Sequence, residues 1–285
     1  MSVVNEVKPE SGGAQVSALR HGLTNVVSAL KMLVRPVRTK TQAPWLLPRR
    51  QLLIATAVFA AVFLLGMIFT DAAAITAARR LPGWIISLFN WLTDFGKSGW
   101  FLWPLGILFL VLAALPQSLT RGSQRVLAAV MVRVGFLFAA IAVPGIITNI
   151  VKHIIGRARP FVGGVADPYL FSPFSWSAAW ASIPSGHGTT AFSVLVAFGM
   201  LWPRARAILL IYAALILASR IVVTAHHPTD VLAGAVVGFA GALMVRHWFA
   251  LRRLGFSIGV DGTLHQYPGP SLKRIKSVAR ELLAQ

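Results

Sequence analysis

Residues 51–70, with the sequence QLLIATAVFAAVFLLGMIFT, form a run of 20 residues that contains no charged side chain. A helix of about 20 apolar residues is long enough to cross the hydrocarbon core of a bilayer. A polar segment of 50 residues that ends in Arg49 and Arg50 lies in front of the run, and small residues follow it. This arrangement fits an uncleaved membrane anchor better than a cleavable signal peptide. We therefore interpret 51–70 as the first transmembrane helix.

The rest of the chain repeats this pattern. Five more apolar runs follow, at 98–115, 126–151, 188–202, 207–224 and 231–245. The chain is 56% hydrophobic and only 12% charged, whereas a soluble domain carries about 25% charged residues. These features predict an all-α, polytopic membrane protein with a bundle of six transmembrane helices. Two of the runs are short, at 15 residues each, which suggests helix ends that are buried in protein.

Three regions follow from this layout: a basic N-terminal segment at 1–50, a six-span domain at 51–250 and a basic tail at 251–285. The segments 15–34 and 75–92 mix apolar and polar residues, which is compatible with helices in the membrane interface, and a solvated or packed helix is the alternative for the first. The absence of Cys excludes disulfides, thiolate nucleophiles and cysteine-ligated metal sites.

Charge is distributed unevenly between the two faces of this bundle. The chain has 27 Lys and Arg against 8 Asp and Glu, a net charge of +19, which is often a sign of nucleic-acid binding. However, 19 of the 27 basic residues fall in the two tails and in the links on one side of the membrane. The positive-inside rule then places both termini in the cytoplasm of a bacterial-type inner membrane. We expect anionic lipid headgroups, and not nucleic acid, as the partners of these charges.

Ionisable residues gather at three span ends on the opposite, non-cytoplasmic face. In the first block, Lys152 and Arg159 are seven residues apart, which places them on nearly the same face if the third helix continues to Pro160. The two cations could hold one anion, or they could simply be basic residues that flank a span. Arg157 should point elsewhere and contact the surface or lipid headgroups.

The second block opens the fourth span with Pro184, Ser185, Gly186 and His187. Ser185 is a good helix N-cap, and the free N–H groups of a first helical turn bind anions. Gly186 would allow a ligand to approach closely, and His187 would lie beside it. A plain helix cap is the alternative interpretation.

The third block joins the fifth and sixth spans and contains Arg220, His226, His227 and Asp230. Because His226 and Asp230 are four residues apart at a helix start, the carboxylate could hold one imidazole nitrogen and leave the other free as a nucleophile. The alternative is a His and Asp pair that only caps the helix. His227 faces another direction, so we expect it to pack against or support the site.

The three blocks match one known pattern in order and in spacing. They are Lys152-x6-Arg159-Pro160, then Pro184-Ser185-Gly186-His187, then Ser219-Arg220-x5-His226-x3-Asp230. This pattern resembles the signature of the type 2 phosphatidic acid phosphatase superfamily, which includes lipid phosphate phosphatases and, more distantly, vanadium haloperoxidases. The resemblance implies a six-helix bundle with its active site at the non-cytoplasmic membrane face.

The resemblance also implies a role for each residue. His226 would attack phosphorus and become a phosphohistidine, with Asp230 orienting its ring. His187 would protonate the leaving alkoxide and then activate water. The phosphate oxygens would be bound by Lys152, Arg159, Arg220 and the backbone N–H groups near Ser185 and Gly186. No cofactor and no metal would be needed, and eight scattered acidic residues supply no carboxylate-rich metal site.

Three functions are compatible with these residues. The first is a membrane phosphatase acting on a lipid phosphate or pyrophosphate, and the second is a lipid phosphotransferase with an acceptor other than water. The third is a non-catalytic anion-binding membrane protein, which would not need an oriented nucleophile. The sequence does not distinguish phosphatidate, phosphatidylglycerol phosphate, undecaprenyl pyrophosphate and lipid A phosphate as substrates. The aromatic loop 161–183 is expected to form an interfacial lid.

Overall fold

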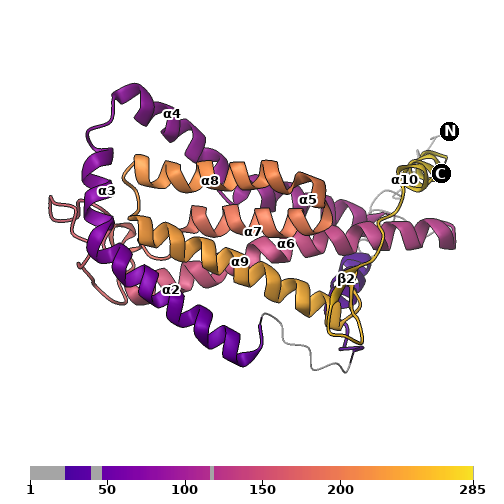
Figure 1. The fold of residues 1–285 in the computed structure, drawn as a ribbon. Helices are drawn as coiled ribbons and strands as arrows, with labels where there is room; N and C mark the ends of the chain where they lie inside the picture. Colours follow the sequence, from indigo (N-terminus) through magenta and orange to yellow (C-terminus); the bar gives the residue numbers. More distant parts are fainter. Residues whose placement is uncertain (1–22, 40–46, 116–118, 285) are drawn as a thin grey trace, which may run out of the picture.

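All six apolar runs form helices in the computed structural model, which describes residues 23–39, 47–115 and 119–284 (Figure 1). The elements in chain order are α2 (Arg49–Phe69), α3 (Asp71–Ala78), α4 (Gly83–Thr93), η1 (Asp94–Gly96), α5 (Gly99–Ala114), α6 (Arg121–Ile155), η2 (Ala178–Trp180), α7 (Gly186–Leu201), η3 (Pro203–Ala205), α8 (Arg206–Val222), α9 (Pro228–Leu251), β1 (Phe256–Ile258), β2 (Leu264–Gln266) and α10 (Leu272–Leu283). A further short helix, Leu23–Leu33, precedes α2. The predicted class, a mostly helical membrane protein, is confirmed.

Within the described residues, five helical segments are long and apolar enough to cross a membrane. They are α2, α6, α9 and the stretches Gly83–Ala114 and Pro203–Val222. The run 188–202 lies in α7, which is apolar but has only 16 residues. A helix of this length spans about 24 Å, less than the ~30 Å of a hydrocarbon core. The count of six spans therefore stays a prediction.

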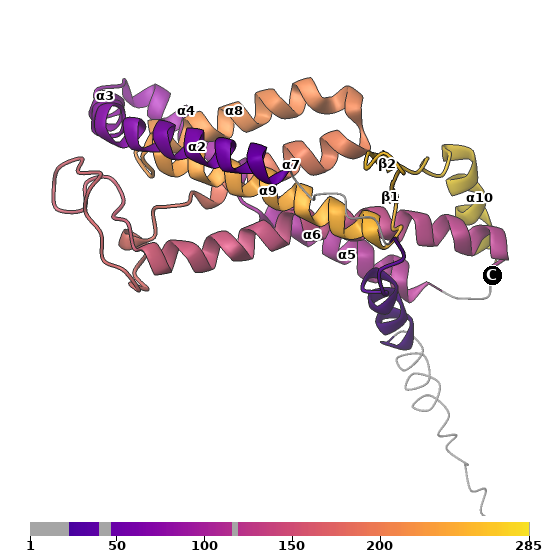
Figure 2. The ribbon, with the colours of Figure 1, turned by 60° about the horizontal axis from the view of Figure 1, so that its bottom comes forward.

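The short helix α7 lies at the centre of the bundle, where it packs most extensively against α9 and also contacts α6 and α8 (Figures 1 and 2). Glycines of α9 allow this close approach. A Cβ at Gly234 would lie 2.3 Å from the backbone oxygen of Ser185, and one at Gly238 would lie 2.3 Å from that of Thr189. Small residues at four-residue spacing bring two membrane helices together in this way. The contact fixes the start of α7 against the start of α9.

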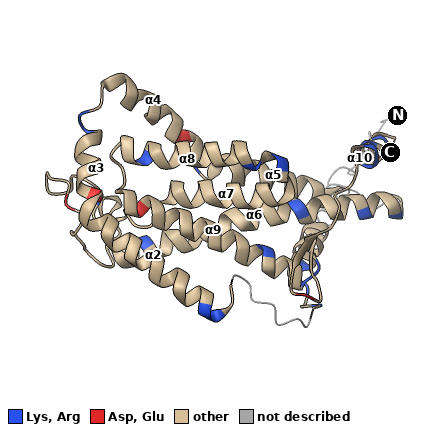
Figure 3. Ribbon diagram, in the orientation of Figure 1, with Lys and Arg blue, Asp and Glu red and all other residues tan. Residues whose placement is uncertain are grey.

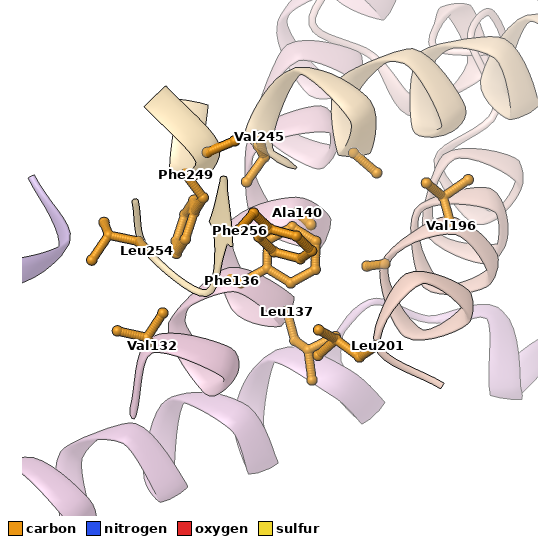
Figure 4. Packing of buried hydrophobic residues seen from close by; sticks show 13 residues of the cluster. Val132, Phe136, Leu137, Ala140, Val196, Leu201, Val245, Phe249, Leu254 and Phe256 are labelled. Atoms are coloured by element: carbon orange, nitrogen blue, oxygen red, sulfur yellow. The ribbon is translucent and has the colours of Figure 1, made fainter. Parts of the chain in front are cut away.

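The main apolar core lies between the N-terminal half of α6 and the C-terminal half of α9 (Figure 4). Phe136 of α6 packs edge-to-face against Phe249 of α9, with ring centroids 5.5 Å apart. It also contacts Phe256 of β1 at 4.8 Å. Leu254 and Phe256 are 2% and 3% exposed, although they belong to the region that we set apart as a tail. The hairpin of β1 and β2 therefore covers the end of this core.

The location of the segments 15–34 and 75–92 in the membrane interface stays a prediction. Residues 15–22 lie outside the described residues, and the rest of the first segment forms the helix Leu23–Leu33, which packs through Ala29 against α5 and α6. The segment 75–92 is not one helix, because Pro82 separates α3 from α4. Proline cannot supply a backbone N–H inside a helix and instead stands at the N-cap of α4.

Candidate active site

The three sequence blocks meet at one end of the bundle. Lys152 lies in the last turn of α6, Arg220 in the last turn of α8 and His187 in the first turn of α7. Arg159 and His226 lie in the connections that follow α6 and α8. Arg159 is within electrostatic range of Lys152, Arg220 and His226. In Figure 3, Lys and Arg occupy both ends of the bundle and leave the middle of the helices uncharged.

The placement of Arg159 depends on a loop and not on a helix. The shared helix face of Lys152 and Arg159 required the third helix to continue to Pro160, and it does not, because α6 ends directly before Gly156, which adopts a left-handed conformation with φ of 64°. A Cβ at Gly156 would lie 1.9 Å from the backbone oxygen of Ser172, so only glycine fits there. The Arg159 backbone N–H donates to the oxygen of Ala179 at 2.8 Å. The returning loop thus directs Arg159 toward Lys152.

The start of α7 has the geometry expected of an anion site. Ser185 is the N-cap, and its hydroxyl accepts a hydrogen bond from the backbone N–H of Gly188 at 3.4 Å. Its own backbone N–H donates to the backbone oxygen of Asp230 at 2.9 Å. Apart from its chain neighbours and the backbone of α7, no atom lies within 4 Å of a Cβ built on Gly186. A ligand oxygen can therefore reach the first-turn N–H groups of α7, which have no intrahelical acceptor.

The relation between His226 and Asp230 is less direct than the spacing suggested. Their closest atoms, Nδ1 and Oδ2, are 3.9 Å apart, which is too long for a hydrogen bond. The Ser182 hydroxyl lies between them, donating to Oδ2 of Asp230 at 2.6 Å and lying 3.4 Å from Nδ1 of His226. The same Oδ2 accepts the backbone N–H of His227 at 2.9 Å. Asp230 therefore both caps α9 and supports the His226 ring through Ser182.

His226 is held in its neutral form. It lies outside the helices, yet only 3% of its surface is exposed. Burial lowers the pKa of His226 to about 3, and the nearby Asp230 carboxylate raises it by less than burial lowers it. A neutral imidazole with Nδ1 directed at Ser182 leaves Nε2 available as a nucleophile at neutral pH.

Known proteins resemble the chain in this region. The model of the PAP2 superfamily matches residues 133–254. The Lipid A 1-phosphatase of Rhizobium johnstonii is 33% identical over 200 residues, which cover 70% of this chain and 81% of that protein. The chain belongs to the PAP2 superfamily. These relatives confirm the family predicted from the sequence and the enzyme class, a phosphoric monoester hydrolase.

Other PAP2 proteins are similar over shorter stretches or at lower identity. Phosphatidylglycerophosphatase B of Escherichia coli is 37% identical over 92 residues, 30% of this chain and 35% of that protein. A crystal structure of LpxE from Aquifex aeolicus has a TM-score of 0.44 at 22% identity, covering 61% of this chain and 93% of that one. The first transmembrane PAP2 type phosphatidylglycerolphosphate phosphatase from Bacillus subtilis has a TM-score of 0.45 at 17% identity, covering 80% and 95%.

The PAP2 site also contains a buried ion cluster around Arg157. We expected Arg157 at the surface or at lipid headgroups, and this is wrong because the residue is 0% exposed. Its Nη1 donates to Oδ1 of Asp230 at 2.6 Å, and its Nη2 donates to Oδ2 of Asp71 at 2.7 Å. Its Nε donates to the backbone oxygen of Pro168 at 3.0 Å. Arg157 thus binds Oδ1 of Asp230, while Ser182 binds Oδ2 of the same carboxylate.

Thr229 completes the cluster. Its hydroxyl donates to Oδ2 of Asp71 at 2.5 Å, and its backbone N–H donates to Oδ1 at 3.0 Å. Asp71 begins α3, so this cluster ties the segment after the first apolar helix to the start of α9. One sequence signal pointed to Asp71, because it is one of only eight acidic residues and directly follows an apolar run. Ionisable residues at such positions are candidates for function.

A groove leads from this site along the apolar part of the bundle. It has a volume of about 550 Å³ and is bounded by α5, α6 and α7. Lys152 and His187 lie on its wall together with Lys97, while Leu102 and Ile146 line its apolar part. Lys97 lies 2.7 Å from Asp94 in an exposed ion pair, and nothing in its sequence position indicates that it lies beside the site. The groove can hold an anion beside the cations and an apolar chain between the helices.

Several buried side-chain nitrogens around the PAP2 site have no hydrogen-bond partner in the described part of the chain. Among them are Nε of Arg159, Nε of Arg220 and Nε2 of His187. Nη1 of Arg220 has a partner, the hydroxyl of Thr93 at 2.5 Å. Buried polar atoms without partners are costly and rare in folded proteins, and they concentrate where a ligand supplies the missing bond. These donors suit the oxygens of a phosphate group.

Proposed function

We propose that this PAP2 protein hydrolyses the phosphate or pyrophosphate of a membrane lipid, without metal, through a phosphohistidine at His226. The observation that supports this proposal is the position of a neutral, buried His226 beside buried cationic donors without partners. An anion-binding protein would need the cations alone. A buried neutral histidine and a second histidine, His187, are the groups that the making and breaking of a bond to phosphorus requires in addition.

The chemical steps follow from the positions of these groups. Nε2 of His226 attacks phosphorus, so that a P–N bond forms while the P–O bond to the lipid breaks. His187, in its protonated imidazolium form, gives a proton to the departing lipid oxygen and becomes neutral. Water then attacks the phosphohistidine, His187 takes up a proton from that water, and the P–N bond breaks to release phosphate. Lys152, Arg159 and Arg220 stabilise the charge on the phosphate oxygens in both steps.

The groove between α5, α6 and α7 supports a lipid as the leaving group. Its cationic end carries Lys152 and His187, and its other end opens toward the apolar surface of α6, where Ile146 is 59% exposed. The Rhizobium relative that aligns with 70% of this chain is a lipid A 1-phosphatase. We therefore favour a glycolipid phosphate as the substrate. Phosphate release from a panel of lipid phosphates, measured with purified protein, tests this choice. Faster hydrolysis of phosphatidylglycerol phosphate than of lipid A would contradict it.

Activity should not depend on a divalent metal, because three cationic side chains and two histidines supply the charge stabilisation and proton transfer. We expect turnover to persist in excess chelator and vanadate to inhibit, since vanadate adopts the trigonal-bipyramidal geometry of the attacked phosphorus. The measurement is phosphate release with and without chelator. Loss of activity in chelator and its return with added magnesium would overturn this mechanism.

The active site should face the non-cytoplasmic side of a bacterial inner membrane, with both termini in the cytoplasm. The chain has no native Cys, so single cysteines can report this topology. Ser177→Cys lies in the exposed loop beside the site, and Val260→Cys lies in the turn of the β1 and β2 hairpin at the other end. An impermeant thiol reagent applied to intact cells should label the first variant and not the second. The reverse pattern would invert the topology.

A further inference from the structure

The C-terminal helix α10 has two distinct faces. Apolar residues recur along it with helical spacing, at Leu272, Ile275, Ala279 and Leu282. Leu272 is 77% exposed, Ile275 is 39% exposed and Ala279 is exposed, while Leu282 is half-buried. Val278 is the buried residue of the helix and lies on the side that contacts α6. The described part of the chain therefore leaves most of the apolar face of α10 uncovered.

A basic face lies next to the apolar one. Lys273, Lys276 and Arg280 follow each other at three- and four-residue spacing, which places them on one side of the helix. All three are exposed. Figure 3 shows the concentration of basic residues on α10. A helix with an apolar face and an adjoining face of Lys and Arg is typical of segments that lie in the surface of an anionic membrane.

Hydrogen bonds attach α10 to the start of α6. Its acidic residue, Glu281, accepts a hydrogen bond from the backbone N–H of Thr120 at 2.5 Å and from the hydroxyl of Ser123. These bonds lower the pKa of Glu281, with the contact to Ser123 having the largest effect. Figures 1 and 2 show α10 running across the end of the bundle, and not along it. This end is opposite to the one that holds the active site.

The end of the apolar helix α5 indicates the depth at which α10 would lie in a bilayer. The apolar helix α5 ends at Ala114, and the residue before that end, Ala113, packs in one cluster with Leu127 of α6. Ser123, to which α10 is attached, lies four residues before Leu127, a distance of about 6 Å along a helix. The headgroup region on each side of the hydrocarbon core is about 5–8 Å thick. With the end of α5 taken as the edge of the hydrocarbon core, α10 lies at headgroup level.

We propose that α10 lies in the surface of the membrane and binds anionic lipids, with Leu272 and Ile275 in the acyl-chain boundary and Lys273 and Lys276 at lipid phosphates. The charges favour this occupant over a second copy of the chain, because a net charge of +19 opposes self-association. The role of the helix would be to hold the end of α6, through Glu281, at a fixed depth in the bilayer.

The test uses the full chain in vesicles of phosphatidylcholine, with or without phosphatidylglycerol. A single Leu272→Cys variant carries an environment-sensitive fluorophore, and nitroxide groups on the lipid acyl chains serve as quenchers. We expect strong quenching and a blue-shifted emission in the vesicles that contain phosphatidylglycerol. Ser277→Cys, on the opposite face of α10, is the matched control and should stay accessible to iodide in the water.

Charge variants test the anionic part of the proposal. Replacing Lys273 and Lys276 by Gln in the labelled protein should reduce the ratio of inserted to free helix about fivefold for each lysine, because a basic residue near an anionic surface contributes about this factor. Arg at the same two positions should preserve the quenching. Since both lysines are exposed and far from the active site, these variants test α10 without testing the phosphatase chemistry.

Several results would contradict the proposal. Equal quenching at Leu272→Cys with and without phosphatidylglycerol would show insertion that does not depend on anionic lipid. Iodide access at Leu272→Cys in both kinds of vesicle would show that the apolar face stays in water. Quenching that changes with the ratio of protein to lipid, and not with lipid type, would identify a second copy of the chain as the partner.

Discussion

His226→Ala should abolish hydrolysis and prevent the formation of any phosphoenzyme, because the variant has no atom that can bond to phosphorus at this position. The loss should exceed ~10⁴-fold, since removal of the nucleophile costs about 10⁶-fold in enzymes that act through a covalent intermediate. Acid-quenched reactions with a ³²P-labelled lipid phosphate would measure both turnover and trapped phosphoprotein. A melting curve of the variant in detergent would separate this effect from loss of the fold.

His187→Ala should behave differently, because it removes the proton partner and keeps the nucleophile. We expect activity to fall by about 10²–10⁴-fold, the usual contribution of general acid–base catalysis. A nitrophenyl phosphate, whose leaving group needs no proton, should partly restore the first step. Phosphohistidine should then accumulate, because water activation is still impaired.

A third histidine provides the control for this pair. His153 lies at the same end of the bundle but stacks on Trp176, with ring centroids 5.0 Å apart, and its Nδ1 lies 2.9 Å from the backbone oxygen of Ser175. We expect His153→Ala to keep most of the activity. If His226→Ala forms a phosphoenzyme and His187→Ala does not, then His187 is the nucleophile and His226 is the proton donor. Wild-type activity in both variants would show that the two histidines are not catalytic and that the site only binds an anion.

Arg157→Met should destabilise the protein by about 3–5 kcal/mol, because the change leaves two buried carboxylates, Asp71 and Asp230, without their common cation. The carboxylate of Asp230 would also lose the contact that fixes one of its oxygens, so kcat should fall along with stability. Arg157→Lys should rescue only in part, because a lysine cannot bridge both carboxylates with the planar fork of arginine. Thermal unfolding in detergent and kinetics on a lipid phosphate measure the two effects.

A double variant distinguishes positioning from simple loss of the fold. Arg157→Met combined with Asp71→Asn removes one positive and one negative charge, so the buried net charge of the cluster is unchanged. We expect this pair to recover about 0.5–3 kcal/mol of stability relative to Arg157→Met, a range typical of coupled neighbours, while kcat stays low. Arg80→Gln, a change at an exposed arginine in the turn after α3, is the control and should alter stability by less than about 0.5 kcal/mol. If Arg157→Met melts like the wild type, the cluster has no structural importance.

Much of the candidate site could be predicted because its signal is local. Ser185, His187, His226 and Asp230 stand next to helix starts that the apolar runs already reveal, and N-capping depends only on neighbouring residues. Alternation of the spans then brings these starts to one face of the membrane. The same reasoning could not find Lys97, because a basic residue beside a span is common and only the groove shows what lies across from it.

The sequence by itself determined the membrane class, the helix positions and the three blocks of the site, since these depend on bilayer thickness and on residues close together along the chain. Only the tertiary structure decided that Arg157 is buried between Asp71 and Asp230, which come from elements 86 and 73 residues away. It also decided that Ser182 stands between His226 and Asp230. The partner of a buried charge depends on which segments the packing of the helices brings together, and local spacing carries no information about that choice.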